Sequence, residues 1–172
     1  MLSLPFSLPM PPASRVQQVS LGLVKFARWT PKALQQQVAQ RLLNQIFAES
    51  IEDGDLDFLE DKFLRMEITD AQFAMSLTVI AVEDRLRIRC LDVNSPDAVI
   101  RGNLASFVKL SAKTVDADTL FFQRKLVMEG DTAVALEFKN LTDAFDLDQL
   151  PKSLREGLQW LAQQHDTDTL AN

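Results

Sequence analysis

Between residues 63 and 90, apolar and polar positions alternate with a period of two, which is the pattern of half-buried β-strands. Short polar turns divide the alternation into three runs, at residues 64–68, 73–79 and 85–90. Because one side of each run is apolar and the other mostly polar, we expect an antiparallel meander with one buried face. Two shorter runs predict a fourth and a fifth strand, at residues 98–101 and 126–129.

Outside these strands, apolar positions recur with the helical period of 3.6 residues. A first helix is expected over residues 14–28, and a second begins at Thr30-Pro31 and ends at Asp53-Gly54. The second helix carries an apolar stripe, which predicts that this side is buried. The stripe consists of Leu34, Val38, Leu42 and Ile46, flanked by Leu43 and Phe47. Later helices are expected over residues 103–112, from residue 132 onward, and after Pro151.

The order of these elements predicts the fold class. The strands cluster along the chain, and the helices collect to one side of them, which is the α+β arrangement. We therefore expect a five-stranded, mainly antiparallel sheet with helices packed on one face and the other face left to solvent.

The most informative stretch is residues 118–141, DTLFFQRKLVMEGDTAVALEFKNL. It predicts a helical turn carrying Phe121 and Phe122, then a strand, then a helix. Gly130 suits a sharp strand-to-helix turn, and Asp131 suits the N-cap of that helix. No side chain here performs acid–base or nucleophilic chemistry. The stretch supplies inward apolar surface, as a container for a greasy molecule requires.

Few residues in the chain could carry catalysis. The single cysteine, Cys90, excludes an intrachain disulfide and fits a reducing compartment. Together with the lone histidine, His165, it excludes most zinc sites and any iron–sulfur cluster held by this chain alone. The many carboxylates lack a histidine or a metal-ligand spacing to organise them. We therefore predict no enzyme, no metal and no cofactor.

Charge is divided unevenly along the chain. Residues 1–48 contain no acidic residue and carry +5, so the remainder carries −11 of the net charge of −6. The acidic body argues against nucleic acid as a partner, whereas the basic front favours an anionic membrane surface. No stretch is apolar enough to span a bilayer, and the start lacks the basic region of a signal peptide. These features predict a cytoplasmic protein, with peripheral attachment to the inner membrane as an added option.

The first helix has three open interpretations. It packs on the domain, pairs two copies in a homodimer, or lies in a membrane interface as a basic amphipathic helix. The membrane interpretation assigns the contact to Arg15, Lys25, Phe26, Arg28 and Trp29.

A row of arginines on the third strand has two interpretations. Arg85, Arg87 and Arg89, extended by Arg101 on another strand, form either a solvated face balanced by acidic neighbours or a docking surface for an acidic partner. The acidic neighbours would be Glu67 and Glu83.

The stretch FFQRKLVMEGD, placed after the meander and the strand at residues 98–101, resembles the sterol carrier protein 2 family over residues 40–145. Proteins of that family hold a hydrophobic tunnel between a five-stranded sheet and its helices. The resemblance implies a lipid-binding domain at residues 30–165, after a proline-rich arm and helix at 1–29 and before a polar tail at 166–172. It implies a lipid-lining role for Phe73, Met75, Leu77, Phe107, Phe121, Phe122, Met128, Val134, Phe138 and Leu141.

A closer likeness covers most of the chain and rests on WTPKALQQQV, DADTLFFQRKLVMEGDT and KNLTDAFDLDQLPKSLR. These segments are similar to the bacterial lipid-binding accessory factors of oxygen-independent ubiquinone biosynthesis. That resemblance implies a protein that handles prenylated quinone precursors and works with the UbiU and UbiV proteins. The alternatives are a non-catalytic scaffold of a biosynthetic complex and a general lipid carrier.

Overall fold

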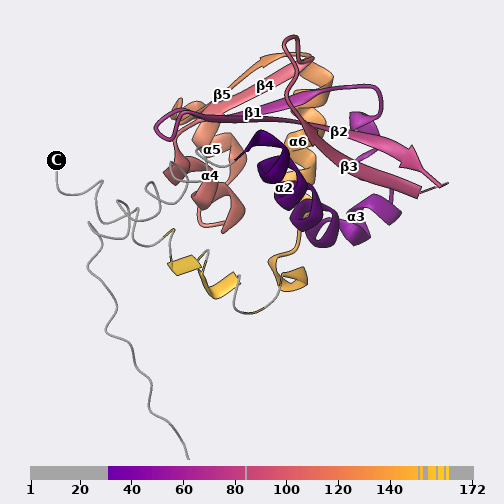
Figure 1. The fold of residues 1–172 in the computed structure, drawn as a ribbon. Helices are drawn as coiled ribbons and strands as arrows, with labels where there is room; N and C mark the ends of the chain where they lie inside the picture. Colours follow the sequence, from indigo (N-terminus) through magenta and orange to yellow (C-terminus); the bar gives the residue numbers. More distant parts are fainter. Residues whose placement is uncertain are drawn as a thin grey trace, which may run out of the picture.

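The computed structural model describes residues 31–83 and 85–150, together with residues 152, 155–157, 159, 160 and 162. Its centre is one five-stranded sheet with the strand order β3-β2-β1-β4-β5 (Figure 1). The strands are β1 (Leu64–Ile68), β2 (Phe73–Val82), β3 (Arg85–Leu91), β4 (Ala98–Gly102) and β5 (Leu126–Gly130). All neighbouring strands are antiparallel except β1 and β4, which are parallel. The predicted meander and the mainly antiparallel sheet are confirmed.

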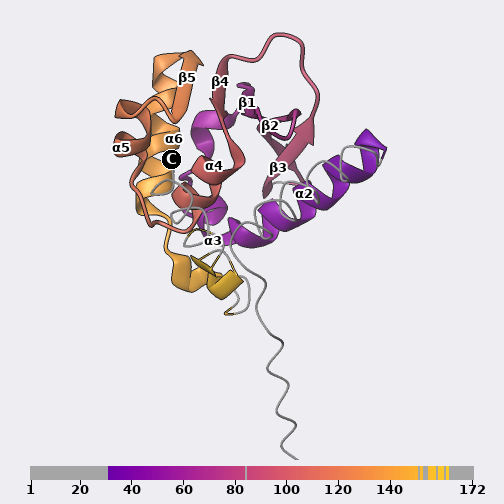
Figure 2. The ribbon, with the colours of Figure 1, turned by 90° about the vertical axis from the view of Figure 1, so that its left-hand side faces the viewer.

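Helices collect under one face of this sheet (Figures 1 and 2). They are α2 (Lys32–Ile46), α3 (Ala48–Glu52), α4 (Leu104–Ser111), α5 (Ala117–Phe122) and α6 (Thr132–Ala144). Two short 3-10 helices, η1 (Asp57–Leu59) and η2 (Leu147–Gln149), join them. The α+β class with helices on one face is therefore confirmed. The predicted helix over residues 14–28, the proline-rich arm and the polar tail lie outside the described residues.

Side-chain oxygens begin three of these helices, as their sequences suggest. Asn103 accepts hydrogen bonds from the Ser106 backbone N–H at the start of α4, and Asp116 does the same for Thr119 in α5. Asp131 caps α6 by accepting from the N–H groups of Ala133 and Val134. These bonds satisfy N–H groups that have no partner within the helix. The predicted N-cap role of Asp131 is confirmed.

Gly130 makes the change from β5 to α6 possible. Its φ of +99° is a conformation that favours glycine, and a β-carbon there would lie 2.2 Å from the carbonyl oxygen of Asp97. The next residue, Asp131, donates its N–H to that same oxygen at 2.8 Å. Lys62 also hydrogen-bonds the Asp131 carboxylate at 3.0 Å, and this bond holds the pKa of Asp131 below its usual value. The junction is therefore tightly determined.

The helix predicted to run from Thr30-Pro31 to Asp53-Gly54 is two helices, because the chain leaves helical geometry at Phe47. The expected burial of its apolar stripe is wrong for three residues. Leu34, Val38 and Leu42 are each about half exposed, at 50%, 51% and 51%. Leu43 and Phe47, which were expected to flank the stripe, contact the core together with Ala39.

The rotation of α2 that exposes the stripe has a physical cause in the sheet. Strand β3 is an edge strand, and its outer backbone groups need partners. Asn44 supplies both for Ile88: its Oδ1 accepts the Ile88 N–H at 3.0 Å, and its Nδ2 donates to the Ile88 carbonyl at 2.8 Å. Gln40 accepts the Cys90 N–H at 3.4 Å. The helix thus turns its amide side chains toward the sheet edge, and the stripe points elsewhere.

Candidate functional site

Nine of the ten predicted lipid-lining residues belong to one apolar cluster between the sheet and the helices. The buried members are Met75, Phe107, Val134, Phe138 and Leu141. The partly buried members are Phe73, Leu77, Phe121 and Met128. Residues from two strands, β2 and β5, and three helices, α4 to α6, thus meet in one apolar interior, as the period-two and period-3.6 patterns predicted.

Phe122 does not belong to this interior. Its side chain is 89% exposed at the end of α5, whereas its neighbour Phe121 is partly buried against the core. The prediction that both rings point inward is wrong for Phe122. Successive side chains of a helix differ in direction by about 100°, so two adjacent residues rarely share one buried face.

The inner face of the sheet carries more apolar side chains than the prediction named. Strand pairing places Met66 beside Met75, and Ile68 beside Phe73, so all four share one face. From the helical side, Leu43, Phe47 and Phe58 pack against the same cluster. Several of these bulky side chains are only partly buried, which is unusual for the inner face of a fully closed core. The apolar interior therefore includes more residues than the ten that were predicted to line it.

One cavity adjoins this interior. It has a volume of about 390 Å³ and lies between α6 and the segment around η1. Leu141, a predicted lipid-lining residue, and Phe58 both line it, together with Gly54, Asp55, Glu137, Asn140 and Ala144. Asp55, Glu137 and Asn140 in its lining are exposed polar residues, so this space opens to solvent and does not by itself form an enclosed lipid site. A continuous tunnel stays a prediction.

A larger groove, of about 520 Å³, lies at the β3 edge of the sheet, beside α2. The α2 side chains Gln40, Arg41, Asn44 and Gln45 form one wall, and Ile80, Val82, Arg87 and Arg89 of β2 and β3 form the rest. Three of its eight lining residues are arginines, so it does not suit an uncharged prenyl chain. We therefore place the candidate lipid site in the apolar interior, although the groove is larger.

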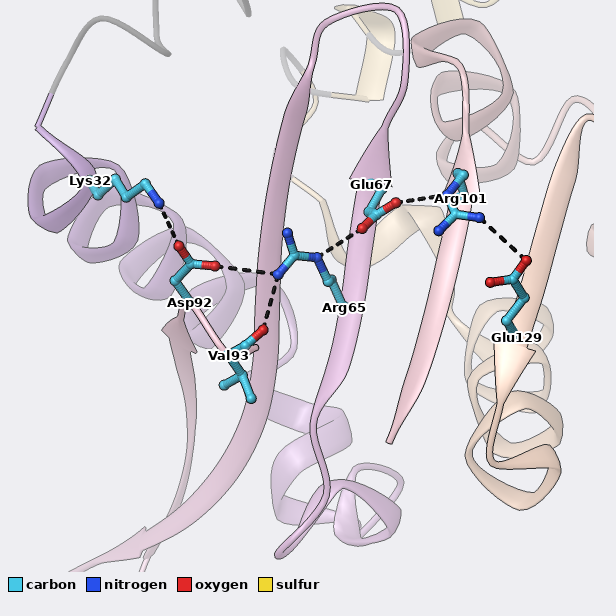
Figure 3. Close-up of polar contacts among 7 residues, drawn as sticks. All are labelled: Lys32, Arg65, Glu67, Asp92, Val93, Arg101 and Glu129. Atoms are coloured by element: carbon cyan, nitrogen blue, oxygen red, sulfur yellow. Dashed lines mark hydrogen bonds and ion pairs between the residues drawn. The ribbon is translucent and has the colours of Figure 1, made fainter. Parts of the chain in front are cut away.

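The outer face of the sheet also carries a continuous chain of ion pairs (Figure 3). Glu67 is at its centre and accepts from Arg65 Nε at 2.9 Å and from Arg101 Nε at 2.7 Å. The hydrogen bond from Arg101 is the main reason that the pKa of Glu67 lies below its usual value. Arg65 continues to Asp92, which also pairs with Lys32, and Arg101 continues to Glu129. Each cation in this series of ion pairs, Lys32, Arg65 and Arg101, therefore has an acidic partner.

The predicted row of arginines differs from this chain in its partners. Arg85, Arg87 and Arg89 are exposed on β3, as expected, but they form no ion pair with any residue in the described part of the chain. The expected balance by Glu67 is wrong, because Glu67 is occupied by Arg65 and Arg101. The grouping with Arg101 is also wrong, since β2 and β1 separate β3 from β4.

The described residues hold little that could react. Cys90 is buried, and burial raises the pKa of its thiol to about 11, so the reactive thiolate is scarce at neutral pH. Among the described residues, no group of three or more His, Cys, Asp or Glu side chains is arranged to hold a metal ion. Within the same part of the chain, no helix is long and apolar enough to cross a bilayer.

Comparison with known proteins agrees with this geometry. Residues 40–143 match the SCP-2 sterol transfer family. The chain belongs to this family. The SCP-2 match covers all five strands and helices α4 to α6 apart from the last residue of α6, and so contains the apolar cluster except for Ala39. The resemblance seen in the sequence is confirmed.

Individual relatives of this SCP-2 chain are equally informative. It is 38% identical over 150 residues to the ubiquinone biosynthesis accessory factor UbiT of Escherichia coli (strain K12), with 87% of this chain and 84% of the relative covered. The UbiT of Escherichia coli O157:H7 gives the same figures. Among solved structures, the UbiJ-SCP2 ubiquinone synthesis protein superposes with a TM-score of 0.51 at 21% identity, covering 67% of this chain and 98% of that one. The last likeness shows the shared fold.

Proposed function

We propose that this protein is a lipid-binding accessory factor of ubiquinone biosynthesis that holds prenylated quinone precursors in its apolar interior and presents them to modifying enzymes. The single observation that carries the proposal is the interior itself, in which bulky apolar side chains from sheet and helices converge without all being buried. Similarity to UbiT supports the pathway, and membership of the SCP-2 family supports the lipid.

The energetics favour a long apolar ligand. Each methylene removed from water contributes roughly 0.8 kcal/mol, so several isoprene units outweigh the cost of ordering a flexible tail. Phenylalanine and methionine suit such a site, because neither has a polar tip that needs a partner and methionine adapts its shape. In our proposal, other proteins supply the modifying chemistry, because an accessory factor binds and presents the precursor. The protein acts in the cytoplasm or at the inner face of the membrane.

Lipid recovered from the purified protein tests this proposal. Mass spectrometry of an organic extract is expected to detect isoprenoid quinones or their precursors. Replacement Met128→Trp fills space on the inner face of β5 and is expected to lower the recovered isoprenoid severalfold. A saturating prenyl quinone should stabilise the parent protein by about 2.7 kcal/mol at one hundred times its Kd, seen as a higher Tm.

The same strand offers a matched control. Val127 lies next to Met128 but on the outer face of β5, where it is partly exposed. Val127→Trp adds the same bulk without entering the interior and should leave the recovered isoprenoid unchanged. If the parent protein yields no isoprenoid and prenyl quinones leave its Tm unchanged, the proposal fails.

Presentation also requires contact with other proteins, and the arginine groove is the part of the surface that favours it. Arg41, Arg87 and Arg89 line that groove and form no ion pair within the described residues, whereas Arg65 and Arg101 on the same face of the sheet are neutralised. Unpaired arginines beside the apolar Ile80 and Val82 are typical of protein interfaces. We therefore assign the groove to an acidic surface of a partner, with UbiU and UbiV as the candidates from the family resemblance.

Binding to purified UbiU and UbiV tests this assignment. The double replacement of Arg87 and Arg89 by alanine is expected to weaken retention of these proteins at least tenfold, and added salt should weaken retention by the parent protein. Arg85→Ala is the control, because Arg85 lies on the same face of β3 but does not line the groove. Equal retention by the double variant and the parent would remove the groove from the interface.

A further inference from the structure

The end of α5 exposes an aromatic side chain that the fold does not use. Phe122 is 89% exposed, the highest value among the large apolar side chains of the described residues. The next highest is Leu136 on α6, at 55%. Because single exposed apolar side chains are common on protein surfaces, the charges and backbone around Phe122 decide what it indicates.

Two basic residues, Arg124 and Lys125, follow Phe122 closely in the segment Phe122–Lys125. Arg124 and Lys125 are exposed, and neither forms an ion pair with another residue in the described ranges. Acidic side chains of α5 are occupied elsewhere: Asp118 pairs with Lys139, and Asp116 caps the helix. The protein has a net charge of −6, yet this tip is locally positive.

The backbone holds these residues in a defined turn. The N–H of Lys125 donates to the Leu120 carbonyl and the N–H of Arg124 to the Phe121 carbonyl, each at 2.9 Å. This is the pair of bonds of a Schellman motif, with Arg124 at the left-handed position and a φ of +54°. That position favours glycine, so an arginine there carries its charge at a conformational cost. The turn therefore presents Phe122 and two cations together at the end of a helix.

We propose that the segment Phe122–Lys125 is a membrane-docking tip that inserts the Phe122 ring into an anionic lipid surface while Arg124 and Lys125 bind lipid headgroups. An aromatic ring at the depth of the headgroups with flanking cations is the side-chain combination that stabilises peripheral membrane attachment. A protein partner is less favoured, because only one large apolar side chain projects here, whereas a protein interface needs a wider apolar centre.

This tip deepens the proposed function and rests on it for its purpose. Phe121 is the neighbour of Phe122 and packs against the apolar cluster, so one short helix contacts both the interior and the proposed lipid surface. A prenylated ligand that leaves the bilayer beside Phe122 would therefore be close to the apolar interior that Phe121 contacts.

Co-sedimentation of the full chain with lipid vesicles tests the proposal. Vesicles of phosphatidylcholine with phosphatidylglycerol should bind the protein, and vesicles of phosphatidylcholine alone should bind it more weakly. Phe122→Ser is expected to weaken binding to the anionic vesicles about tenfold or more, and Arg124→Gln or Lys125→Gln by roughly fivefold each. Leu136→Ser removes an exposed apolar side chain from α6 and should change nothing. An equal loss in Phe122→Ser and Leu136→Ser would overturn the proposal.

A tryptophan reporter keeps the test decisive if the basic front of the chain also contributes to vesicle binding. Phe122→Trp should add a component whose fluorescence shifts to the blue when anionic vesicles are added, and Leu136→Trp should not. A Phe122→Trp component that keeps the emission of a water-exposed indole in vesicle-bound protein would overturn the tip. A blue shift of the Phe122→Trp fluorescence caused by a protein partner without lipid would also overturn the proposed membrane-docking tip.

The outcomes separate this inference from the proposed function. If Phe122→Ser loses vesicle binding but retains co-purified isoprenoid, both stand, because docking and storage are distinct steps. If the parent protein binds vesicles through Phe122 but yields no isoprenoid, the tip stands and the proposed function fails. If isoprenoid is present and Phe122→Ser binds vesicles like the parent, the tip fails alone.

Discussion

Replacement of Gly130 by alanine is expected to destabilise the fold by about 3 kcal/mol or more. Two causes add. The φ of +99° is unfavourable for alanine, and the new β-carbon would lie 2.2 Å from the carbonyl oxygen of Asp97 and 3.0 Å from the Ala98 Cα. Both contacts are backbone atoms, one just before β4 and one at its first residue, so no side-chain rotation relieves them. Urea unfolding of the variant and the parent protein measures the difference.

Gly54 provides the control for this prediction. It also has a positive φ, +82°, but a β-carbon there would approach only the Asp57 side chain, at 3.2 Å. Gly54→Ala therefore has the conformational cost without the backbone clash, and a smaller loss of about 1 kcal/mol is expected. If the two variants unfold at the same urea concentration, β4 and β5 separate enough to accept the methyl group, and the junction is less rigid than its geometry indicates.

The strands and the apolar interior could be predicted because local patterns determine them. The period-two alternation in β1 to β3 identifies which residues face inward, and the observed pairing of Met66 with Met75 agrees with it. Similarly, Gly130 and Asp131 predict a strand-to-helix turn, because glycine tolerates a positive φ and aspartate is a favoured N-cap residue. These features depend on neighbours within a few positions, so one sequence suffices.

The errors concern the direction in which a helix faces. For α2, the stripe of Leu34, Val38 and Leu42 is the more hydrophobic side, yet the helix turns Asn44 toward the sheet. Two backbone groups on the β3 edge require partners, and this need comes from strand order, which periodicity does not contain. Phe122 was misplaced for a related reason. Its short helix has only two turns, too few to define an apolar face.

The ion-pair chain shows the same limit for charged residues. Glu67 was expected to balance the arginines of β3, because Glu67 and these arginines were all expected to face solvent. The parallel pairing of β1 with β4 instead places Glu67 beside Arg101. That pairing joins segments more than 30 residues apart in the sequence. It leaves Arg87 and Arg89 without partners in the described residues, which is what makes their groove a candidate interface.

Removal of the Asn44 amide is the second change with a large expected effect. Asn44→Ala deletes both hydrogen bonds to Ile88, at 3.0 Å and 2.8 Å, and leaves the N–H and the carbonyl of a partly buried edge strand without their partner. We expect a loss of about 2 kcal/mol in unfolding free energy, since each bond contributes roughly 1 kcal/mol and an unpaired group adds to the cost. Because a bare edge strand pairs with other chains, the variant should also form soluble oligomers, visible by light scattering.

Gln45→Ala is the control, being the adjacent α2 residue that lines the groove without a bond to β3. If Asn44→Ala is as stable and as monodisperse as Gln45→Ala, water satisfies the edge as well as the amide does. The orientation of α2 would then need another cause.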